Sequence, residues 1–362
     1  MKTVNLKHDS AIKHVTGQSV YVNDIATHRQ LIGRVIYSPV AHARISLLDT
    51  KAALKLDGIV AILTKKDIPG ENQMGPVIHD ELCRAEDEVT FIGQAIALIA
   101  AETEDAAFNA EKLIRIEFEE LERILTLQEA IKKDSLIAPV RTIECGNVED
   151  VFKSAPHIIS GELETGAQEH WYLETQSALA IPGEGKEMLI HASSQNPAET
   201  QAIVAEVLGV SKNEIDVEVR RMGGGFGGKE TQGNHVAAWA ALLANATRRP
   251  VGIHLFRDDD QKITGKRHRF LSKYKIAFTD EGKILAYSVE LNSDAGAATD
   301  LSRAILERAM LHVENSYFIP NCKIVGKAYK TNLPSNTAFR GFGGPQGMAV
   351  IETAIDRMAR FL

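Results

Sequence analysis

Residues 222–230 read Met-Gly-Gly-Gly-Phe-Gly-Gly-Lys-Glu, and residues 338–346 read Ala-Phe-Arg-Gly-Phe-Gly-Gly-Pro-Gln. One chain thus carries two loops built around Phe-Gly-Gly. Glycines at this density permit positive φ angles and let backbone N–H groups approach a ligand closely, although they raise the entropy lost on folding. Each loop also precedes a segment of helical composition, and a helix N-terminus favours oxygen-rich or anionic groups. The pair of loops therefore indicates a ligand site.

The first loop formally matches two nucleotide-binding patterns, and both matches fail on chemistry. Gly223 to Lys229 fits the start of a P-loop, but the position that needs a hydroxyl for Mg²⁺ is Glu230. Gly223, Gly225 and Gly228 fit the dinucleotide fingerprint, which requires an acidic residue about 20 positions further on. The basic stretch 247–249 lies there instead. We therefore expect no nucleotide at this loop.

The composition bounds the class of protein. The chain has 362 residues, of which 44% are hydrophobic and 25% charged, and its net charge is −7. These values are typical of an ordinary globular protein with two or three cores, and they give no basic footprint for nucleic acid. No apolar run approaches the ~20 residues that cross a bilayer, and the N-terminus lacks a hydrophobic signal core, so we expect a cytoplasmic protein. The three cysteines, Cys83, Cys145 and Cys322, cannot form a disulfide framework or an iron–sulfur ligand set by themselves.

Short strand-like and helix-like segments alternate along the chain. Apolar runs predict strands at 31–36, 59–63, 92–100, 114–118, 188–193, 215–221 and 323–330. Helices are predicted at 105–112, 127–132, 235–246 and from Pro345 to the last residue. Asn196 and Pro197 form the start signal of another helix, which Gly209 ends. The pattern predicts domains at 1–120 and 157–362 joined by a connecting segment, 121–156.

Polar and aromatic motifs along both parts resemble those of the molybdenum hydroxylases, in particular the molybdopterin-binding part of xanthine dehydrogenases. In the first part the resemblance rests on residues 14–24, 38–45, 63–70 and 91–97. In the second part it rests on residues 166–174, 195–196, 222–230 and 330–346. The resemblance implies a mixed α/β (α+β) fold, with a small hammerhead-like domain followed by the first molybdenum-cofactor domain.

The resemblance also implies roles for single residues. Gln195 would hydrogen-bond an oxygen ligand of the metal, Phe226 and Gly227 would offer backbone near the cofactor, and Arg340 would lie beside metal and pterin. No residue would ligate the metal directly, since an organic dithiolene holds it, and the protein supplies hydrogen-bond donors around it. The substrate-binding residues would be Glu230, Arg308 and Phe342.

Those three residues point to a purine substrate. By resemblance, Glu230 and Arg308 face the purine from opposite sides while Phe342 packs on its ring, and related aldehyde oxidases lack this charged pair. A carboxylate and a guanidinium offer complementary acceptors and donors to ring N–H and C=O groups. We expect part of an oxidoreductase that converts xanthine or hypoxanthine to uric acid. Two alternatives stay open: a scaffold or assembly subunit without catalysis, and a hydroxylase of aldehydes or other N-heterocycles.

The resemblance finally implies partners. The family's large subunit continues past the position of Leu362 into a second cofactor domain, which carries a glutamate that acts as general base. No catalytic base is therefore assigned within the chain. Molybdenum–molybdopterin would be shared with that domain or a partner subunit, and 2Fe–2S clusters and FAD would lie on partner chains.

Overall fold

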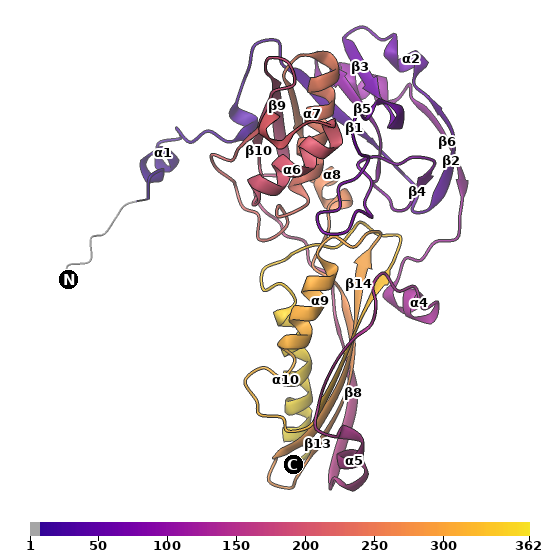
Figure 1. Ribbon diagram of the computed structural model, residues 1–362, viewed down its shortest axis with the longest axis vertical. Coiled ribbons are helices and arrows are strands. Elements are labelled where there is room, and N and C mark those ends of the chain that lie inside the picture. The colour runs from indigo at the N-terminus through magenta and orange to yellow at the C-terminus, as the bar shows by residue number, and fades with distance from the viewer. Residues whose placement is uncertain (1–7) are drawn as a thin grey trace, which may run out of the picture.

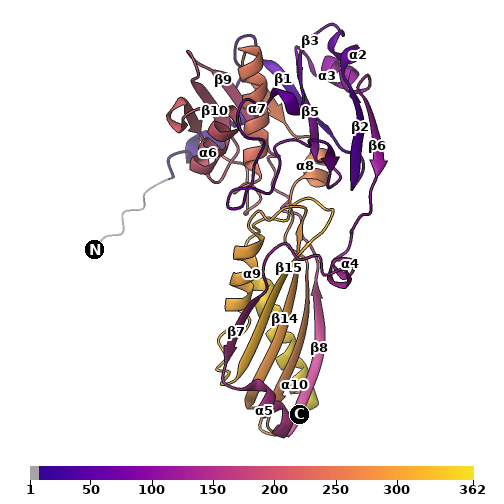
Figure 2. The same cartoon turned by 45° about the vertical axis from the view of Figure 1, so that its right-hand side comes forward.

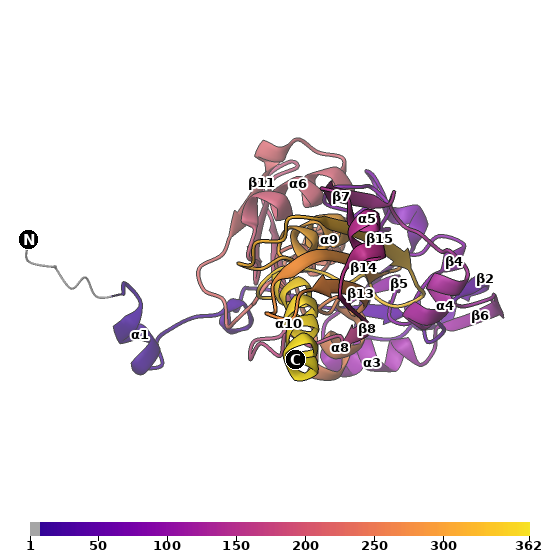
Figure 3. The same ribbon diagram turned by 90° about the horizontal axis from the view of Figure 1, so that it is seen from below.

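The computed structural model describes residues 8–362, and it consists of two lobes (Figures 1 and 2). The upper lobe contains a seven-stranded and a three-stranded sheet, and the lower lobe contains a five-stranded sheet. This mixed α/β architecture is the fold class that the sequence predicts. A short helix, α1 (Ala11–Val15), has no buried residue and lies away from both lobes (Figure 3).

The seven-stranded sheet contains strands from both predicted domains. Its order is β11 (Ile215–Glu218), β10 (Met188–Ala192), β9 (Ser177–Pro182), β12 (Val251–His254), β1 (Leu31–Tyr37), β5 (Ala95–Ala101) and β3 (Ile59–Leu63). Strand β1 pairs in parallel with β12 and antiparallel with β5, so sequence segments 1–120 and 157–362 share one sheet. The division into two domains, 1–120 and 157–362, remains a prediction.

Helices cover both faces of this sheet. The Ala-rich α7 (Gly233–Thr247) and α6 (Pro197–Leu208) pack on one face in the largest hydrophobic cluster of the chain. On the other face, α2 (Lys51–Leu54) and α3 (Glu104–Glu111) contribute alanines to a smaller cluster. Helix α8 (Arg257–Ile263) follows β12. The three-stranded sheet has the order β4 (Glu88–Val89), β2 (Ala43–Asp49), β6 (Arg115–Glu120).

The lower lobe is a five-stranded sheet with helices on opposite faces. Its order is β7 (Arg141–Cys145), β15 (Cys322–Lys330), β14 (Ile284–Gly296), β13 (Phe270–Phe278) and β8 (His157–Thr165). The even-numbered residues of β13 pack against α9 (Ser302–Leu311) and α10 (Gly344–Phe361), whereas Ala277 packs against α5 (Val148–Ser154). Helix α4 (Leu127–Lys132) packs on Tyr329 of β15. The alternation of contacts along β13 is typical of a strand whose two faces are both covered.

Most predicted elements near the loops are present with small shifts of their ends. Helix α6 begins and ends at the predicted residues, with Asn196 as its cap and Gly209 at φ 64°. The strand predicted at 92–100 starts later, at Ala95, because Gly93 adopts φ 98° in a turn. The connecting segment 121–156 contains more order than predicted, since it supplies α5 and the edge strand β7 as well as α4. The remaining short helices are η1 (Val22–Asp24), η2 (Lys65–Asp67) and η3 (Lys212–Glu214).

Candidate functional site

The two glycine loops lie against each other where the lobes meet. The first runs from the end of β11 to α7, and the second runs from β15 to α10. The backbone N–H of Arg340 donates to the Phe226 carbonyl at 2.9 Å. A Cβ added to Gly227, whose φ is 102°, would lie only 2.6 Å from the Ala338 carbonyl oxygen. Only glycine permits this backbone-to-backbone contact without a shift of one loop.

Gln195 joins the first loop to the start of α6. Its Oε1 accepts hydrogen bonds from the backbone N–H groups of Gly227 at 2.8 Å and Lys229 at 3.3 Å. Its own N–H donates to the Lys229 carbonyl at 2.8 Å. The two donors fix the orientation of the amide oxygen. The exposed NH₂ group at the other end of the amide has no hydrogen-bond partner among residues 8–362. Gln195 therefore presents a fixed hydrogen-bond donor.

A pocket of about 410 Å³ lies between the two loops. The structure brings together six of the seven site residues predicted from the sequence. The pocket is lined by Gln195, Phe226, Gly227, Glu230, Ala338, Phe339, Arg340, Gly341 and Phe342. The lining holds one carboxylate and no cysteine or histidine, so it is poor in ligands for a metal ion and rich in hydrogen-bond donors.

The two phenylalanines of the loops share an unusual backbone conformation. Phe226 has φ 55° and Phe342 has φ 49°, in the left-handed region that bulky residues seldom adopt. A tight turn supports each residue, because Gly228 N–H donates to Gly225 at 2.8 Å and Phe342 N–H donates to Phe339 at 2.7 Å. Phe226 keeps half of its surface exposed. Strained residues of this kind cluster at ligand sites.

Glu230 brings the one acidic side chain of the pocket. It is partly buried, and that burial raises the pKa of its carboxyl group above the ordinary value. Its charge in turn contributes to the raised pKa of Glu199, after burial of Glu199 itself. A carboxyl group with a raised pKa can accept a hydrogen bond when ionised and donate one when protonated.

Arg308 is the predicted site residue that does not line the pocket. It is exposed on α9, and its neighbour Glu307 forms an ion pair with Arg141 at 3.1 Å. The helix nevertheless packs against the second loop, because a Cβ on Gly343 would lie 2.1 Å from the Ile305 carbonyl oxygen. The structure therefore places Arg308 on a helix that contacts the second loop, and its position opposite Glu230 remains a prediction.

Lys229 is a structural residue that the sequence analysis did not assign. Its ammonium group is fully buried and donates to the Glu174 carbonyl at 2.7 Å, to Ser193 Oγ at 2.7 Å and to the Glu174 carboxylate at 3.3 Å. Burial lowers the pKa of this ammonium group, and Glu174 opposes the shift. An ammonium group has three donors, and these contacts use them. Lys229 thus fastens the first loop and has no proton left for a phosphate.

Asp300 connects the two loops, and it is a second residue that the sequence analysis did not assign. Its carboxylate accepts hydrogen bonds from Thr231 at 2.7 Å, from Gln232 at 2.8 Å and from Thr337 at 3.0 Å. Thr231 follows Glu230, and Thr337 precedes the second loop. Burial, followed by the charge of Glu81, raises the pKa of Asp300 to about 7. One buried carboxyl group therefore holds both loops in register.

Two further contacts hold the second loop. His170 Nε2 lies 2.7 Å from the Ala338 carbonyl oxygen, and burial lowers the pKa of this imidazole. The guanidinium of Arg267 stacks 3.8 Å above the Phe339 ring and donates to the Arg340 carbonyl at 3.0 Å. Of His170 and Arg267, only His170 stands in one of the motifs that carry the family resemblance.

Two family models match this chain. A molybdopterin cofactor-binding domain model matches residues 130–362. The hammerhead domain model of aldehyde oxidases and xanthine dehydrogenases matches residues 16–122. The chain belongs to the molybdenum hydroxylase family. The expected family and the expected order of a hammerhead region before a cofactor-binding region are thereby confirmed.

Relatives with different substrates in their names match the chain about equally well. A xanthine dehydrogenase of Dictyostelium discoideum is 46% identical over 99% of this chain. A mouse protein named aldehyde oxidase 3 is 44% identical over 98% of it. The chain spans 26% of the length of each of these two relatives. Among solved structures, an aldehyde oxidoreductase from Desulfovibrio gigas superimposes with a TM-score of 0.90 at 26% identity, over 97% of this chain and 41% of that one.

No helix between residues 8 and 362 combines the length and the apolar composition that a membrane crossing requires.

Proposed function

We propose that the pocket between the glycine loops binds molybdenum–molybdopterin and that the assembled protein hydroxylates a purine. The pocket residues fit such a cofactor. Gln195 offers an NH₂ group, and the guanidinium of the exposed Arg340 makes no ion pair within residues 8–362. The lining has no cysteine or histidine, which suits a metal that an organic dithiolene already holds.

Each residue of the pocket has a defined task in this proposal. The cofactor, when bound, supplies the redox chemistry that accepts two electrons from the substrate. Gln195 would donate a hydrogen bond from its NH₂ group to the cofactor, and it keeps its orientation because the N–H groups of Gly227 and Lys229 hold the amide oxygen. Phe226 and Phe342 exclude water from the reacting face with their rings, and Arg340 supplies positive charge to an anionic group.

The observation that favours a purine is the carboxyl group of Glu230 in the pocket lining. Xanthine and hypoxanthine have ring N–H and C=O groups along an edge that a carboxyl group can pair with, whereas a simple aldehyde has no N–H group and no C=O group apart from the reacting one. The near-equal identities to a xanthine dehydrogenase and to an aldehyde oxidase do not separate these substrates. Arg308 is the proposed cation on the opposite side, where it would stabilise negative charge that develops on the ring.

We also propose that further protein surface closes the pocket. Trp171 and Leu173 are 65% and 92% exposed, and they lie beside the first loop because Glu174 exchanges hydrogen bonds with Gly223. Exposed apolar side chains next to a polar pocket mark a contact surface. The proposed partners are a second cofactor domain, which would bring the general-base glutamate, and the domains or subunits with 2Fe–2S clusters and FAD.

The test uses the assembled enzyme with Glu230→Val and Arg308→Met. Loss of one partner of a buried hydrogen bond to substrate typically removes ~1 to 3 kcal/mol, so kcat/KM for xanthine or hypoxanthine should fall at least about tenfold. Turnover of an aromatic aldehyde should fall less or rise. Equal losses for both substrates would refute the purine assignment. A complex that contains no molybdenum would instead favour a scaffold or assembly role.

A further inference from the structure

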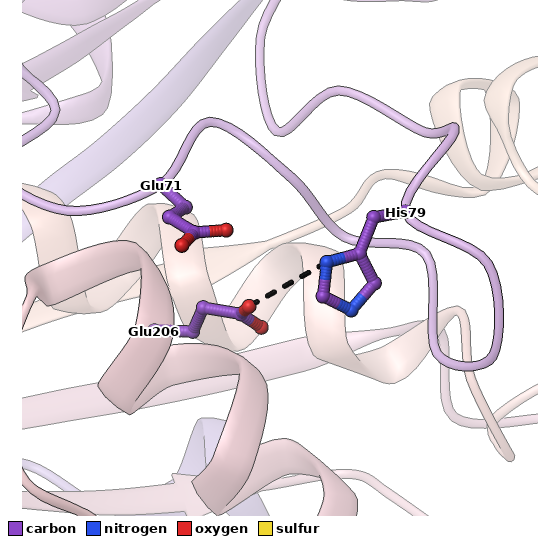
Figure 4. A group of neighbouring side chains, drawn as sticks. All are labelled: Glu71, His79 and Glu206. Atoms are coloured by element: carbon purple, nitrogen blue, oxygen red, sulfur yellow. Dashed lines mark ion pairs between the residues drawn. The ribbon is translucent and has the colours of Figure 1, made fainter.

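A cluster of metal-ligand side chains lies on the upper lobe outside the pocket. Glu71, His79 and Glu206 each offer one ligand atom, and these atoms lie within 4.8 Å of one another. Figure 4 shows Glu71 and His79 on one loop, both facing the Glu206 side chain of α6. His79 Nδ1 is 3.7 Å from Glu206 Oε1. The three residues therefore converge from two separate segments of the chain.

Backbone contacts fix the loop against the end of α6. The N–H of Gly70 donates to the Val207 carbonyl, and the N–H of Glu71 donates to the carbonyl of Glu206, each at 3.0 Å. A Cβ on Gly70 would lie 2.1 Å from that Glu206 carbonyl oxygen, so the approach requires glycine. Backbone hydrogen bonds thus keep Glu71 close to Glu206 independently of the side-chain conformations.

This arrangement leaves negative charge without a matching cation. No lysine or arginine within residues 8–362 forms an ion pair with Glu71 or Glu206, and the one ionisable contact of Glu206 is His79. Two carboxylates at such a distance repel each other unless a cation or a proton intervenes. A divalent cation would neutralise both.

Gln73 supplies an independent sign that the cluster takes a ligand. This side chain is only 6% exposed, and its Nε2 donates to Glu206 Oε2 at 2.5 Å. The oxygen of the same amide has no hydrogen-bond partner within the described chain. A buried polar atom without a partner is rare in a native structure. Gln73 thus holds Oε2 of Glu206 and leaves Oε1 of Glu206 on the side of His79, while the buried oxygen of the same Gln73 amide stays without a partner.

We propose that Glu71, His79 and Glu206 bind one divalent transition-metal ion, with Zn²⁺ as the best match. One imidazole with two carboxylates suits Zn²⁺, whereas Mg²⁺ and Ca²⁺ prefer oxygen ligands alone. Tetrahedral Zn²⁺ with bond lengths of ~2.0 to 2.2 Å places its ligand atoms ~3.3 Å apart, so rotation of exposed side chains closes the present spacing. Water completes the coordination.

The ion would restrain a loop that contacts the residue next to Asp300, which holds the two glycine loops. Helix α6 starts at Pro197, two residues after Gln195, and Glu206 lies in its last turn. On the other side of the cluster, Asp80 follows His79 and accepts a hydrogen bond from the Thr299 N–H at 3.0 Å, next to Asp300. The metal therefore has a structural role at a junction and does not take part in the redox chemistry.

The experiment measures Zn²⁺ binding to the chelator-treated, dialysed full chain by calorimetry. A Cys145→Ser background removes the exposed thiol as a competing ligand. We expect one Zn²⁺ per chain, a rise in melting temperature on binding, and affinities for Mg²⁺ and Ca²⁺ at least about tenfold weaker than for Zn²⁺. Co²⁺ in place of Zn²⁺ should give visible absorption bands typical of low coordination.

Variants assign the site. His79→Ala, Glu71→Gln and Glu206→Gln should each weaken Zn²⁺ binding at least about tenfold and remove the Co²⁺ bands. His28→Ala and Glu184→Gln, two exposed positions far from the cluster in the sequence, are matched controls and should bind as the parent does. Circular dichroism checks that each variant is folded. Absence of Zn²⁺ binding in the parent, or binding that survives all three cluster variants, would overturn the proposal.

Discussion

The backbone N–H of Gly227 donates to Gln195 Oε1 at 2.8 Å, which couples the first glycine loop to the residue that precedes the N-cap of α6. This one contact fixes which end of the amide faces the pocket. It therefore separates two tasks of Gln195, because the oxygen holds the loop and the NH₂ group serves the ligand. Substitutions can remove these tasks one at a time.

Gln195→Glu keeps an oxygen for the N–H groups of Gly227 and Lys229 but replaces the NH₂ donor with an acceptor. We expect a change in unfolding free energy within about 1 kcal/mol and a fall in kcat of at least about tenfold in the assembled enzyme. Gln195→Ala, which removes both functions, should lower stability and activity together. Unfolding curves and steady-state kinetics measure the two effects, and a fully active Gln195→Glu enzyme would refute the donor role.

Gly227→Ala should destabilise the chain by about 2 to 4 kcal/mol. The positive φ of 102° strains any side chain, and the added Cβ would lie 2.6 Å from the Ala338 carbonyl oxygen. Gly185→Ala is the matched control, because Gly185 has φ 55° and no atom within 4 Å of its added Cβ. The control should lose only about 1 kcal/mol in urea unfolding. Similar losses at both positions would mean that the loops do not touch in solution.

Asp300 predicts a pH dependence of stability. Folding raises the pKa of its carboxyl group from the ordinary 3.8 to about 7, because the group is buried. A raised carboxyl pKa favours folding fully below pH 3.8, and this contribution is lost as the pH rises towards 7. The stability of the parent relative to Asp300→Asn should therefore decline between about pH 4 and pH 7 and stay constant above it. Urea unfolding of both proteins across this range measures the difference, and a difference that does not vary with pH would contradict the assignment.

Local signals explain which elements could be predicted from sequence. Two residues determine where helix α6 begins and ends. Asn196 caps the N–H of Glu199, and Gly209 ends the helix with φ 64°. Strand β7 carried no such signal, because its residues are mostly exposed and it is a strand only through its pairing with β15. The hairpin of β13 and β14 did carry one, since alternate residues from Phe270 to Phe278 are apolar or small and Gly282 follows in the turn. The strands predicted from the sequence do not include this hairpin.

The candidate site shows the same division. Gln195, Glu230 and Phe342 could be named because the motifs around them resemble a known family. Asp300 and Lys229 could not, since their importance lies in contacts with residues tens of positions away. Arg308 marks the limit of residue-by-residue transfer, because it lies on α9 and is absent from the pocket lining.

Lys229→Met tests whether the lysine of the first loop is a structural residue or a phosphate ligand. Methionine fills a similar volume but leaves the partly buried Glu174 carboxylate and Ser193 without their cation. Removing one partner of a buried ion pair typically costs about 3 kcal/mol or more, so the free energy of unfolding in urea should fall by that amount. Lys186→Met, at an exposed position, is the control and should change it by less than about 0.5 kcal/mol. Mg²⁺–ATP and NAD should leave the melting temperature of the parent unchanged, because the ammonium protons are already used. A nucleotide-dependent rise that disappears in Lys229→Met, with stability otherwise intact, would instead identify the loop as a phosphate-binding loop.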